Sequence, residues 1–149
     1  PLPSASTDAV VCAQAFHWFS TEAALAEIHR VLKPDGRLGL VWNVRDESVD
    51  WVAAITDIIT PYEGDTPRFH TGRWREAFTG EYFSEPEMTC FPYSHVGSPQ
   101  EVIMDRFLSV SFIAALADGP KASVTAQLQA LIDTHPLSGY PRITWITQP

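Results

Sequence analysis

Two short apolar runs joined by a helical segment constrain the fold of this chain more than any other feature. The first run, Asp8–Gln14, contains two adjacent valines, and the second, Arg37–Asn43, is also nearly continuously apolar. Such runs are typical of strands that are buried on both faces of a parallel sheet. The segment between them is long enough for a crossover helix, so the two strands are predicted to run parallel.

The joining segment has the pattern of an amphipathic helix over Thr21–Lys33. Ser20 is the expected N-cap, because a serine hydroxyl can accept a hydrogen bond from a free N–H of the first turn. An apolar stripe at helical spacing is predicted to face the core, and it consists of Leu25, Ile28 and Leu32. Pro34–Gly36 ends the helix, since proline cannot continue it and glycine permits a tight turn.

The middle of the chain is predicted to hold one helix, an irregular segment and one strand. The helix covers 51–60, has Asp50 as its expected N-cap, and turns its isoleucines inward. Residues 62–85 combine many aromatic and charged side chains, which is typical either of a packed surface loop or of a lid over a site. Met88–His95 has the pattern of a strand, and Pro92 within it favours a position at the sheet edge.

The last third is predicted to form two helices and a final strand. Ser98 and Glu101 have the spacing of a capping box at the start of the first helix. Gly119–Pro120 is expected to break the chain before the second helix. Tyr140–Thr147 is rich in β-branched residues and is predicted to be the last strand.

Charge and cysteine usage argue against several classes of function. The formal net charge of -8 is expected to repel nucleic-acid phosphates and anionic membrane surfaces, so neither is predicted as a partner. Cys12 and Cys90 are far apart in sequence and are expected to be buried free thiols, with no disulfide and no zinc site. No apolar run reaches the length of a membrane span, and a cytoplasmic location is expected.

Two phrases of the sequence resemble a known enzyme family. They are Asp8–Phe19 (DAVVCAQAFHWF) and Glu27–Leu38 (EIHRVLKPDGRL). Together they resemble the fourth strand, following helix and fifth strand of class I S-adenosylmethionine-dependent methyltransferases of the type 11 branch, which methylates small molecules. The resemblance implies an α/β, Rossmann-like fold of which strands four to seven are present, with a mostly parallel sheet and an antiparallel last strand.

The resemblance also implies that 1–149 is a partial methyltransferase domain. Its expected parts are a core over 1–60, an irregular segment with an edge strand over 61–97, and two covering helices with the last strand over 98–149. The family's G-x-G-x-G turn is not in the sequence, so the main half of the cofactor site is expected to be missing. The strand Asp8–Gln14 would then present an unpaired edge, and we expect marginal stability, a homo-oligomer or a complementing chain.

The function implied by the resemblance is transfer of a methyl group from S-adenosylmethionine to a small-molecule acceptor. The cofactor side is assigned to Ala13, Gln14 and Phe16, and the acceptor side to His17, Trp18, Asn43 and Arg106. No metal ligand set is expected. His17 is the candidate catalytic residue, because a histidine can accept a proton or orient a hydroxyl or carboxylate. Trp18 could face the sulfonium charge, and Arg106 could clamp a carboxylate with two hydrogen bonds.

Each of these assignments has a structural alternative. Phe16 and Trp18 are equally explained as core residues, His17 as a hydrogen-bonded structural histidine, and Arg106 as a surface arginine. At the level of the whole chain, we expect the truncated domain to be inactive alone, and its status as an enzyme stays open. The alternative function is a non-catalytic remnant or partner-binding module with a methyltransferase-like fold.

Overall fold

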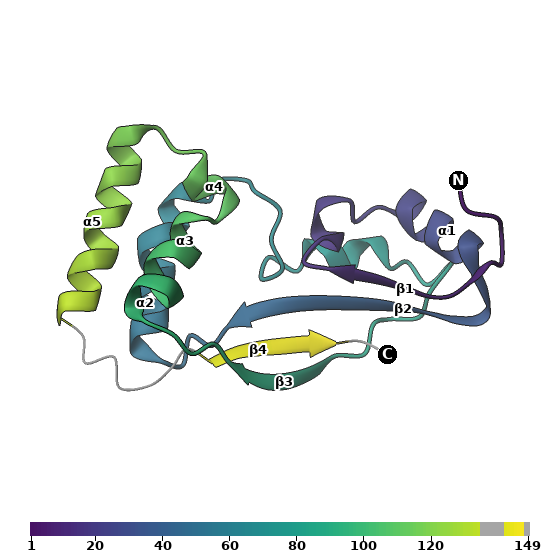
Figure 1. Cartoon of the computed structure of the whole chain (residues 1–149). Coiled ribbons are helices and arrows are strands. Elements are labelled where there is room, and N and C mark those ends of the chain that lie inside the picture. Colours follow the sequence, from purple (N-terminus) through teal and green to yellow (C-terminus); the bar gives the residue numbers. More distant parts are fainter. Residues whose placement is uncertain (135–141, 148–149) are drawn as a thin grey trace. The chain divides into compact units, whose positions relative to one another are not determined.

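The computed structural model describes residues 1–134 and 142–147, and it is an α/β structure (Figure 1). The chain divides into two compact units, which are described separately here. The first unit consists mainly of residues 1–44 and 67–91. The second consists mainly of residues 45–66 and 92–134.

Four strands and five α-helices are found in the part of the chain that the structure describes. The strands are β1 (Thr7–Ala13), β2 (Leu32–Arg45), β3 (Thr89–Ser94) and β4 (Arg142–Thr147). The α-helices are α1 (Glu22–Val31), α2 (Asp50–Ile59), α3 (Arg106–Leu108), α4 (Ser111–Ala114) and α5 (Asp118–Thr134). Shorter 3-10 turns lie at Phe16–Trp18, Thr60–Tyr62 and Arg73–Ala77, and a π-helical segment lies at Gln100–Asp105.

The strands form one sheet in the order β1-β2-β4-β3. β1 pairs with β2 in parallel, with Ala13 opposite Val41 at the carboxyl end, which confirms the prediction from the two apolar runs. The arrow of β4 runs against that of β2, as expected for the last strand (Figure 1). β3 lies at the sheet edge, where the missing N–H of Pro92 is tolerated.

The core of the first unit is an aromatic cluster on one face of β1 and β2. Because side chains alternate along a strand, Leu38, Leu40 and Trp42 of β2 all face this cluster. Its buried members are Cys12, Phe16, Leu25, Leu38, Leu40, Trp42, Trp74 and Ala77. The ring centroids of Trp42 and Trp74 are 4.7 Å apart, a separation typical of aromatic pairs in protein cores.

Helix α1 begins one residue later than predicted, so the expected Ser20 cap is wrong. Thr21 is the N-cap, and its hydroxyl accepts a hydrogen bond from the Ala24 N–H at 3.2 Å. Thr21 has the extended backbone (φ -128°, ψ 155°) that a capping residue needs. Threonine and serine both serve as caps, and the sequence alone did not separate two neighbours of the same chemistry.

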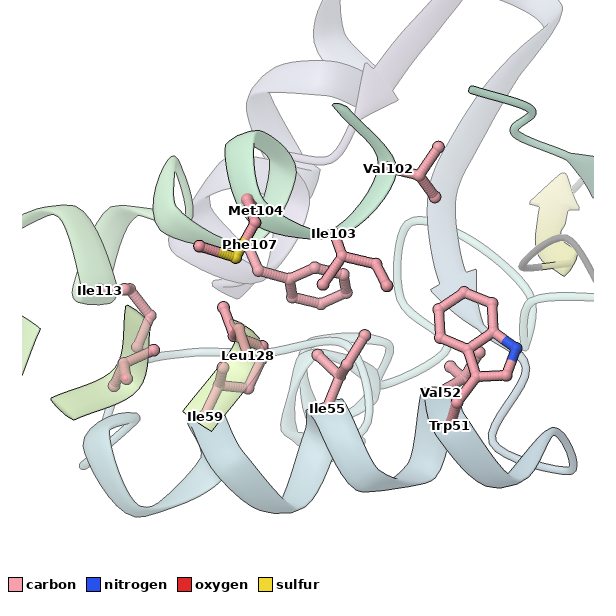
Figure 2. Packing of buried hydrophobic residues seen from close by; sticks show 11 residues of the cluster. Trp51, Val52, Ile55, Ile59, Val102, Ile103, Met104, Phe107, Ile113 and Leu128 are labelled. Carbon is pink, nitrogen blue, oxygen red and sulfur yellow. The ribbon is translucent and has the colours of Figure 1, made fainter. Parts of the chain in front are cut away.

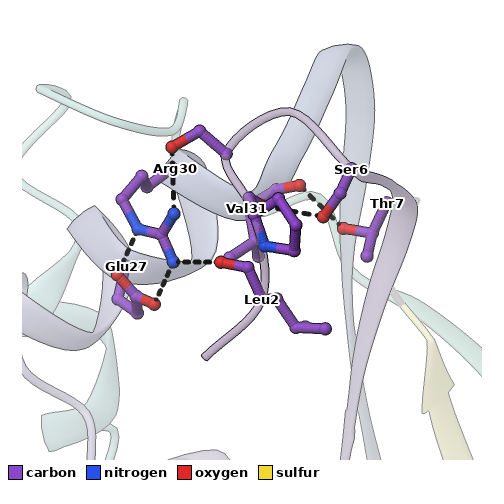
Figure 3. A network of polar contacts seen from close by, with 8 residues as sticks. Leu2, Ser6, Thr7, Glu27, Arg30 and Val31 are labelled. Carbon is purple, nitrogen blue, oxygen red and sulfur yellow. Dashed lines mark hydrogen bonds and ion pairs between the residues drawn. The ribbon is translucent and has the colours of Figure 1, made fainter.

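Arg30 near the end of α1 ties the first residues of the chain to the helix (Figure 3). Its Nε and Nη2 donate to the two carboxylate oxygens of Glu27 at 2.7 and 2.6 Å. The same guanidinium donates to the Ser4 hydroxyl and to the Leu2 carbonyl, both at 2.9 Å. The residues before β1 are therefore bound by the guanidinium of Arg30 as well as by backbone hydrogen bonds.

The core of the second unit is an aliphatic cluster between α2, the π-helical segment and α5 (Figure 2). Ile55 and Ile59 of α2 are buried as predicted, and Ile58 packs at the border of the cluster. Ile113 and Leu128, from α4 and α5, are fully buried in the same cluster. The helices of this unit are therefore held mainly by dispersion and burial of branched side chains.

Several local predictions in the second unit fail for identifiable reasons. The N-cap of α2 is Val49, whose side chain cannot accept a hydrogen bond, and Asp50 is instead the first helical residue, where its charge meets the helix dipole. Gly119–Pro120 lies inside the first turn of α5 and does not break the chain, because first-turn N–H groups need no helical acceptor.

The capping box before the π-helical segment is confirmed, whereas the helix after it is not continuous. The Ser98 N–H donates to Glu101 Oε2 at 2.9 Å, and the Glu101 N–H donates to Ser98 Oγ at 3.3 Å. The chain then passes through π-helical, α3 and α4 segments. Cys90 is exposed on β3, so only Cys12 is the buried thiol that was expected. Part of the predicted last strand, residues 140–141, lies outside the described residues.

Candidate functional site

The carboxyl end of β1 turns sharply at Gln14. The Gln14 N–H donates to the Val41 carbonyl at 2.8 Å, so pairing with β2 continues to this residue. Its φ of 55° then lies in the left-handed region, which is uncommon for a residue with a side chain. The turn ends the strand and leads directly into the 3-10 turn Phe16–Trp18, which carries three of the predicted site residues.

Phe16 anchors this turn in the aromatic cluster. Its side chain is fully buried, and its ring meets Phe19 edge-on at a centroid distance of 5.5 Å and Phe78 at 5.7 Å. Trp18 is the opposite case, with 53% of its surface exposed. Of the two aromatic candidates, Phe16 therefore fixes the backbone of the turn, and Trp18 presents its ring to the outside of the unit.

His17 is oriented by a hydrogen bond from Trp42. The indole Nε1 of Trp42 donates to His17 Nδ1 at 2.9 Å. An indole N–H is a donor only, so Nδ1 must be the acceptor and carries no proton. A neutral His17 then carries its proton on Nε2, which makes Nε2 a donor.

The surroundings of His17 also favour its neutral form. Burial lowers the pKa of the imidazole, and the positive charge of Arg68 lowers it further. With Nδ1 engaged by Trp42 and the proton on Nε2, the ring is arranged to donate a hydrogen bond outward. Of the two roles predicted for His17, orienting an acceptor group matches this arrangement better than accepting a proton.

A hollow of about 150 Å³ opens beside His17 in the first unit. It is lined by His17, Ser20, Arg68, Thr71, Arg73 and Trp74. The residues from 68 to 74 belong to the aromatic and charged segment that the sequence left undecided between a packed loop and a lid. Sequence reasoning missed Arg68 and Arg73 as site residues, and the only signal was the basic spot at Arg73–Arg75.

Asn43 lies on the other face of the sheet from His17. Trp42 faces the aromatic cluster, so the alternation of β2 turns Asn43 to the opposite side, together with Val41 and its partner Ala13. The Oδ1 atom of Asn43 is buried and has no hydrogen-bond partner among the described residues. The predicted site residues of the first unit are thus divided between two faces of one strand pair.

Arg106 belongs to the second unit. Its side chain is half-buried, and burial lowers its pKa. The Nη1 atom lies 3.4 Å from His95 Nδ1. Both residues lie within the second unit, and a carboxylate clamp at Arg106 stays a prediction.

Residues 1–134 and 142–147 contain neither a metal-ligand cluster nor a membrane-spanning helix. Over these ranges no group of three or more histidine, cysteine, aspartate or glutamate side chains is arranged to hold a metal ion. None of the helices in the same ranges has the length and apolar character needed to cross a bilayer.

Comparisons with known proteins agree with the resemblance seen in the sequence. Residues 1–40 match the family model described as a methyltransferase domain. An uncharacterized methyltransferase-like protein of Schizosaccharomyces pombe is 42% identical over 138 residues, which is 91% of this chain and 53% of that protein. An uncharacterized methyltransferase of Mycobacterium tuberculosis is 37% identical over 136 residues, again 91% of this chain and 53% of the relative. The chain thus spans about half the length of the curated relatives it matches.

Solved structures show the same fold at low sequence identity. A protein described as a methyltransferase from an antibiotic biosynthesis pathway of Anabaena variabilis has a TM-score of 0.67 at 17% identity, covering 99% of this chain and 68% of its own. A protein described as a type II methyltransferase of Anaeromyxobacter dehalogenans has a TM-score of 0.55 at 22% identity, covering 98% of this chain and 64% of its own. The expected Rossmann-like methyltransferase fold is therefore confirmed.

Proposed function

The chain belongs to the methyltransferase domain family, and on this premise we propose that it takes part in S-adenosylmethionine-dependent methyl transfer to a small-molecule acceptor. The observation that carries the proposal is the carboxyl edge of β1 and β2. There β1 ends beside β2, which continues to Arg45, with Gln14 in a sharp turn and Asn43 two residues beyond Val41 of the last strand pair. In open α/β sheets, this edge is where ligands bind.

The residues at this edge fit the cofactor. Asn43 Oδ1 is buried without a partner in the described part of the chain, and a buried acceptor in that state costs about 1–3 kcal/mol until a donor reaches it. S-adenosylmethionine carries amino and hydroxyl donors, and the small side chain of Ala13 on the same face leaves room for it. We assign Ala13, Gln14 and Asn43 to holding the cofactor, with Phe16 fixing the turn beside them.

When bound, the cofactor supplies a methyl group on a positively charged sulfur. The exposed ring of Trp18 is suited to face a positive charge, since an aromatic face attracts cations. His17 contributes a neutral Nε2–H that can donate a hydrogen bond to the acceptor molecule. Binding of a carboxylate by Arg106 stays a separate proposal for the second unit.

The alternative proposal is a partner-binding module that has the fold without the activity. It is favoured by the position of β1 at the sheet edge and by the 65% exposure of Val11 on it. A strand in this position can pair with a second copy or with a complementing chain. A small-molecule acceptor, a cytoplasmic location and the absence of nucleic-acid partners remain parts of the main proposal.

Calorimetric titration with S-adenosylmethionine tests the main proposal, with the oligomeric state measured in parallel. Micromolar binding would support the proposal for this chain, and Asn43→Ala should then weaken the affinity about threefold to tenfold, the contribution of one hydrogen bond. Gln127→Ala removes a comparable amide from the exposed side of α5 and should leave affinity unchanged. No binding at millimolar cofactor would reject the enzyme proposal for this chain and support the partner-binding alternative.

A further inference from the structure

We propose that the hollow beside His17 binds an anionic oxygen group, a carboxylate or a phosphate, on the acceptor molecule. The assignment of this group to the acceptor rests on the proposed methyl transfer. The binding of an anion in the hollow does not, and it can be measured without the cofactor. The inference names a chemical class for the small molecule that the family relationship leaves open.

The charge of the lining is the first argument. Arg68 and Arg73 both line the hollow, and no acidic side chain is among its lining residues in the described part of the chain. Arginine is also the side chain whose planar fork best matches a carboxylate or phosphate.

The state of His17 is the second argument. Trp42 occupies Nδ1 from the core side, so the neutral ring can only donate from Nε2. The Nε2–H of the neutral His17 can therefore donate a directed hydrogen bond to an anion, in addition to the attraction of the positively charged arginines. The imidazole of His17 and the two arginines are all hydrogen-bond donors, so they favour a ligand that accepts hydrogen bonds.

The rigidity of the loop is the third argument. Trp74 is buried, its Nε1 donates to the Phe69 carbonyl at 3.1 Å, and its ring lies against Trp42. The Thr71 hydroxyl donates to the Arg68 carbonyl at 2.9 Å, and this bond stabilises the loop. Among the described residues, the hydroxyl of Ser20 also lines the hollow and has no such bond. Pre-organised side chains lose little entropy on binding, which favours recognition of a specific group.

The size of the hollow is the fourth argument. A volume of about 150 Å³ corresponds to roughly five water molecules at about 30 Å³ each. That volume accommodates a carboxylate or phosphate group with a short stem, and it is too small for a whole nucleoside. The hollow therefore recognises one charged end of the acceptor.

Nuclear magnetic resonance of the intact chain tests the tautomer directly. The nitrogen chemical shifts of His17 near neutral pH are expected to show a protonated Nε2 and an unprotonated Nδ1. In Trp42→Phe the donor to Nδ1 is gone, and a mixture of tautomers is expected. A wild-type ring with its proton on Nδ1 would overturn the donor role of His17 and with it the second argument.

Anion binding to the wild-type chain is measured through the indole N–H signal of Trp42. The probes are succinate, inorganic phosphate and the uncharged succinamide, each added at constant ionic strength and without cofactor. We expect saturable shifts with succinate or with phosphate and none with succinamide. Whichever anion binds more tightly identifies the acceptor group as carboxylate or phosphate.

The matched variants are Arg73→Gln and Arg37→Gln. Both remove one exposed positive charge from the first unit, and only Arg73 lines the hollow beside His17. Loss of a charged hydrogen bond predicts affinity weaker by about tenfold or more in Arg73→Gln, with Arg37→Gln unchanged. Ser20→Ala provides a second lining variant, expected to weaken binding by a few-fold.

Two results would overturn the proposal. One is the lack of any shift with succinate and phosphate at tens of millimolar. The other is equal weakening by Arg73→Gln and Arg37→Gln, which would mean that net charge alone attracts the anion. Neither result affects the cofactor titration, so failure of this inference and failure of the proposed methyl transfer are seen in separate experiments.

Discussion

The two units of this chain have cores of different chemistry. The aromatic cluster of the first unit contains Trp42, Trp74 and Phe16, whereas the aliphatic cluster of the second is dominated by isoleucine, valine and leucine. Both bury apolar surface and hold helices or strands in place. The aliphatic cluster also contains a tryptophan, Trp51, whereas in the aromatic cluster the indole N–H of Trp42 orients a histidine at a hollow.

The difference shows how a core can take part in a site. An aliphatic side chain offers only shape, so its mutation changes stability and little else. A buried tryptophan offers shape and one directed donor, so its mutation can change stability and the protonation of a neighbour together. Mutations in the two clusters should therefore differ in whether they change stability alone or also change the protonation of His17.

The largest effect is expected from Trp74→Ala in the aromatic cluster. The variant removes a fully buried indole, and such truncations cost about 3–5 kcal/mol of unfolding free energy. Urea unfolding monitored by circular dichroism measures the loss. Trp18→Ala is the matched control, because the ring is 53% exposed, and a loss as large as that of Trp74→Ala would contradict the burial described here.

The next largest effect is expected from Ile55→Ala in the aliphatic cluster. The side chain is fully buried, and removing it predicts a loss of about 2–5 kcal/mol. Hydrogen exchange should rise over residues 45–66 and 92–134, with little change in residues 1–44. Ile58→Ala, at the border of the cluster, serves as the control with a smaller loss. Equal exchange in both units would mean that the two cores do not unfold separately.

Trp42→Phe is expected to have a moderate effect on stability and a specific effect on His17. The variant keeps an aromatic ring and removes the Nε1–H that bonds to His17 Nδ1, so about 0.5–1.5 kcal/mol should be lost. The pKa of His17 should rise, because protonation of Nδ1 no longer breaks a hydrogen bond. Titration of the imidazole by magnetic resonance measures this, and an unchanged pKa would show that the Trp42 bond has no influence on the ring.

The smallest effect is expected from the titration of His17. Burial and then the charge of Arg68 lower its pKa in the folded chain, so the neutral ring is favoured by folding. The corresponding stability is fully present above the ordinary histidine pKa of about 6.5, and it is lost as pH falls from there through the lower folded pKa. The effect is small because the imidazole is only half-buried and solvent screens the charge of Arg68.

Urea unfolding at several pH values in this range, for the wild type and for His17→Gln, measures the contribution. The variant should have a flatter pH profile than the wild type. A slope of the same size in both would assign the pH dependence to other groups and remove His17 from the account.

The sequence predicted features that depend on neighbours in the chain. The parallel pair β1 and β2, the capping box at Ser98 and the inward isoleucines of α2 follow from periodicity and spacing, which are local. The caps at Ser20 and Asp50 were wrong by one residue, because the backbone angles decide which residue is the cap and side-chain chemistry alone does not.

The site was less accessible from the sequence because it depends on distant contacts. His17 was chosen as a candidate, yet its tautomer is set by Trp42, which is 25 residues away in the chain. Arg68 and Arg73 join the hollow through the folding of an irregular segment that has no periodicity. The separation of Asn43 from His17 follows from strand alternation once the start of β2 is known.

The close pair of Trp42 and Trp74 also gives the first unit an optical property. Two indole rings with centroids 4.7 Å apart and planes inclined by 36° are close enough for their electronic transitions to couple. The near-ultraviolet circular dichroism and the fluorescence of the folded chain should therefore be dominated by this pair. Since Trp42 contacts the imidazole, emission should also respond to protonation of His17, and the protein carries its own reporter beside the hollow.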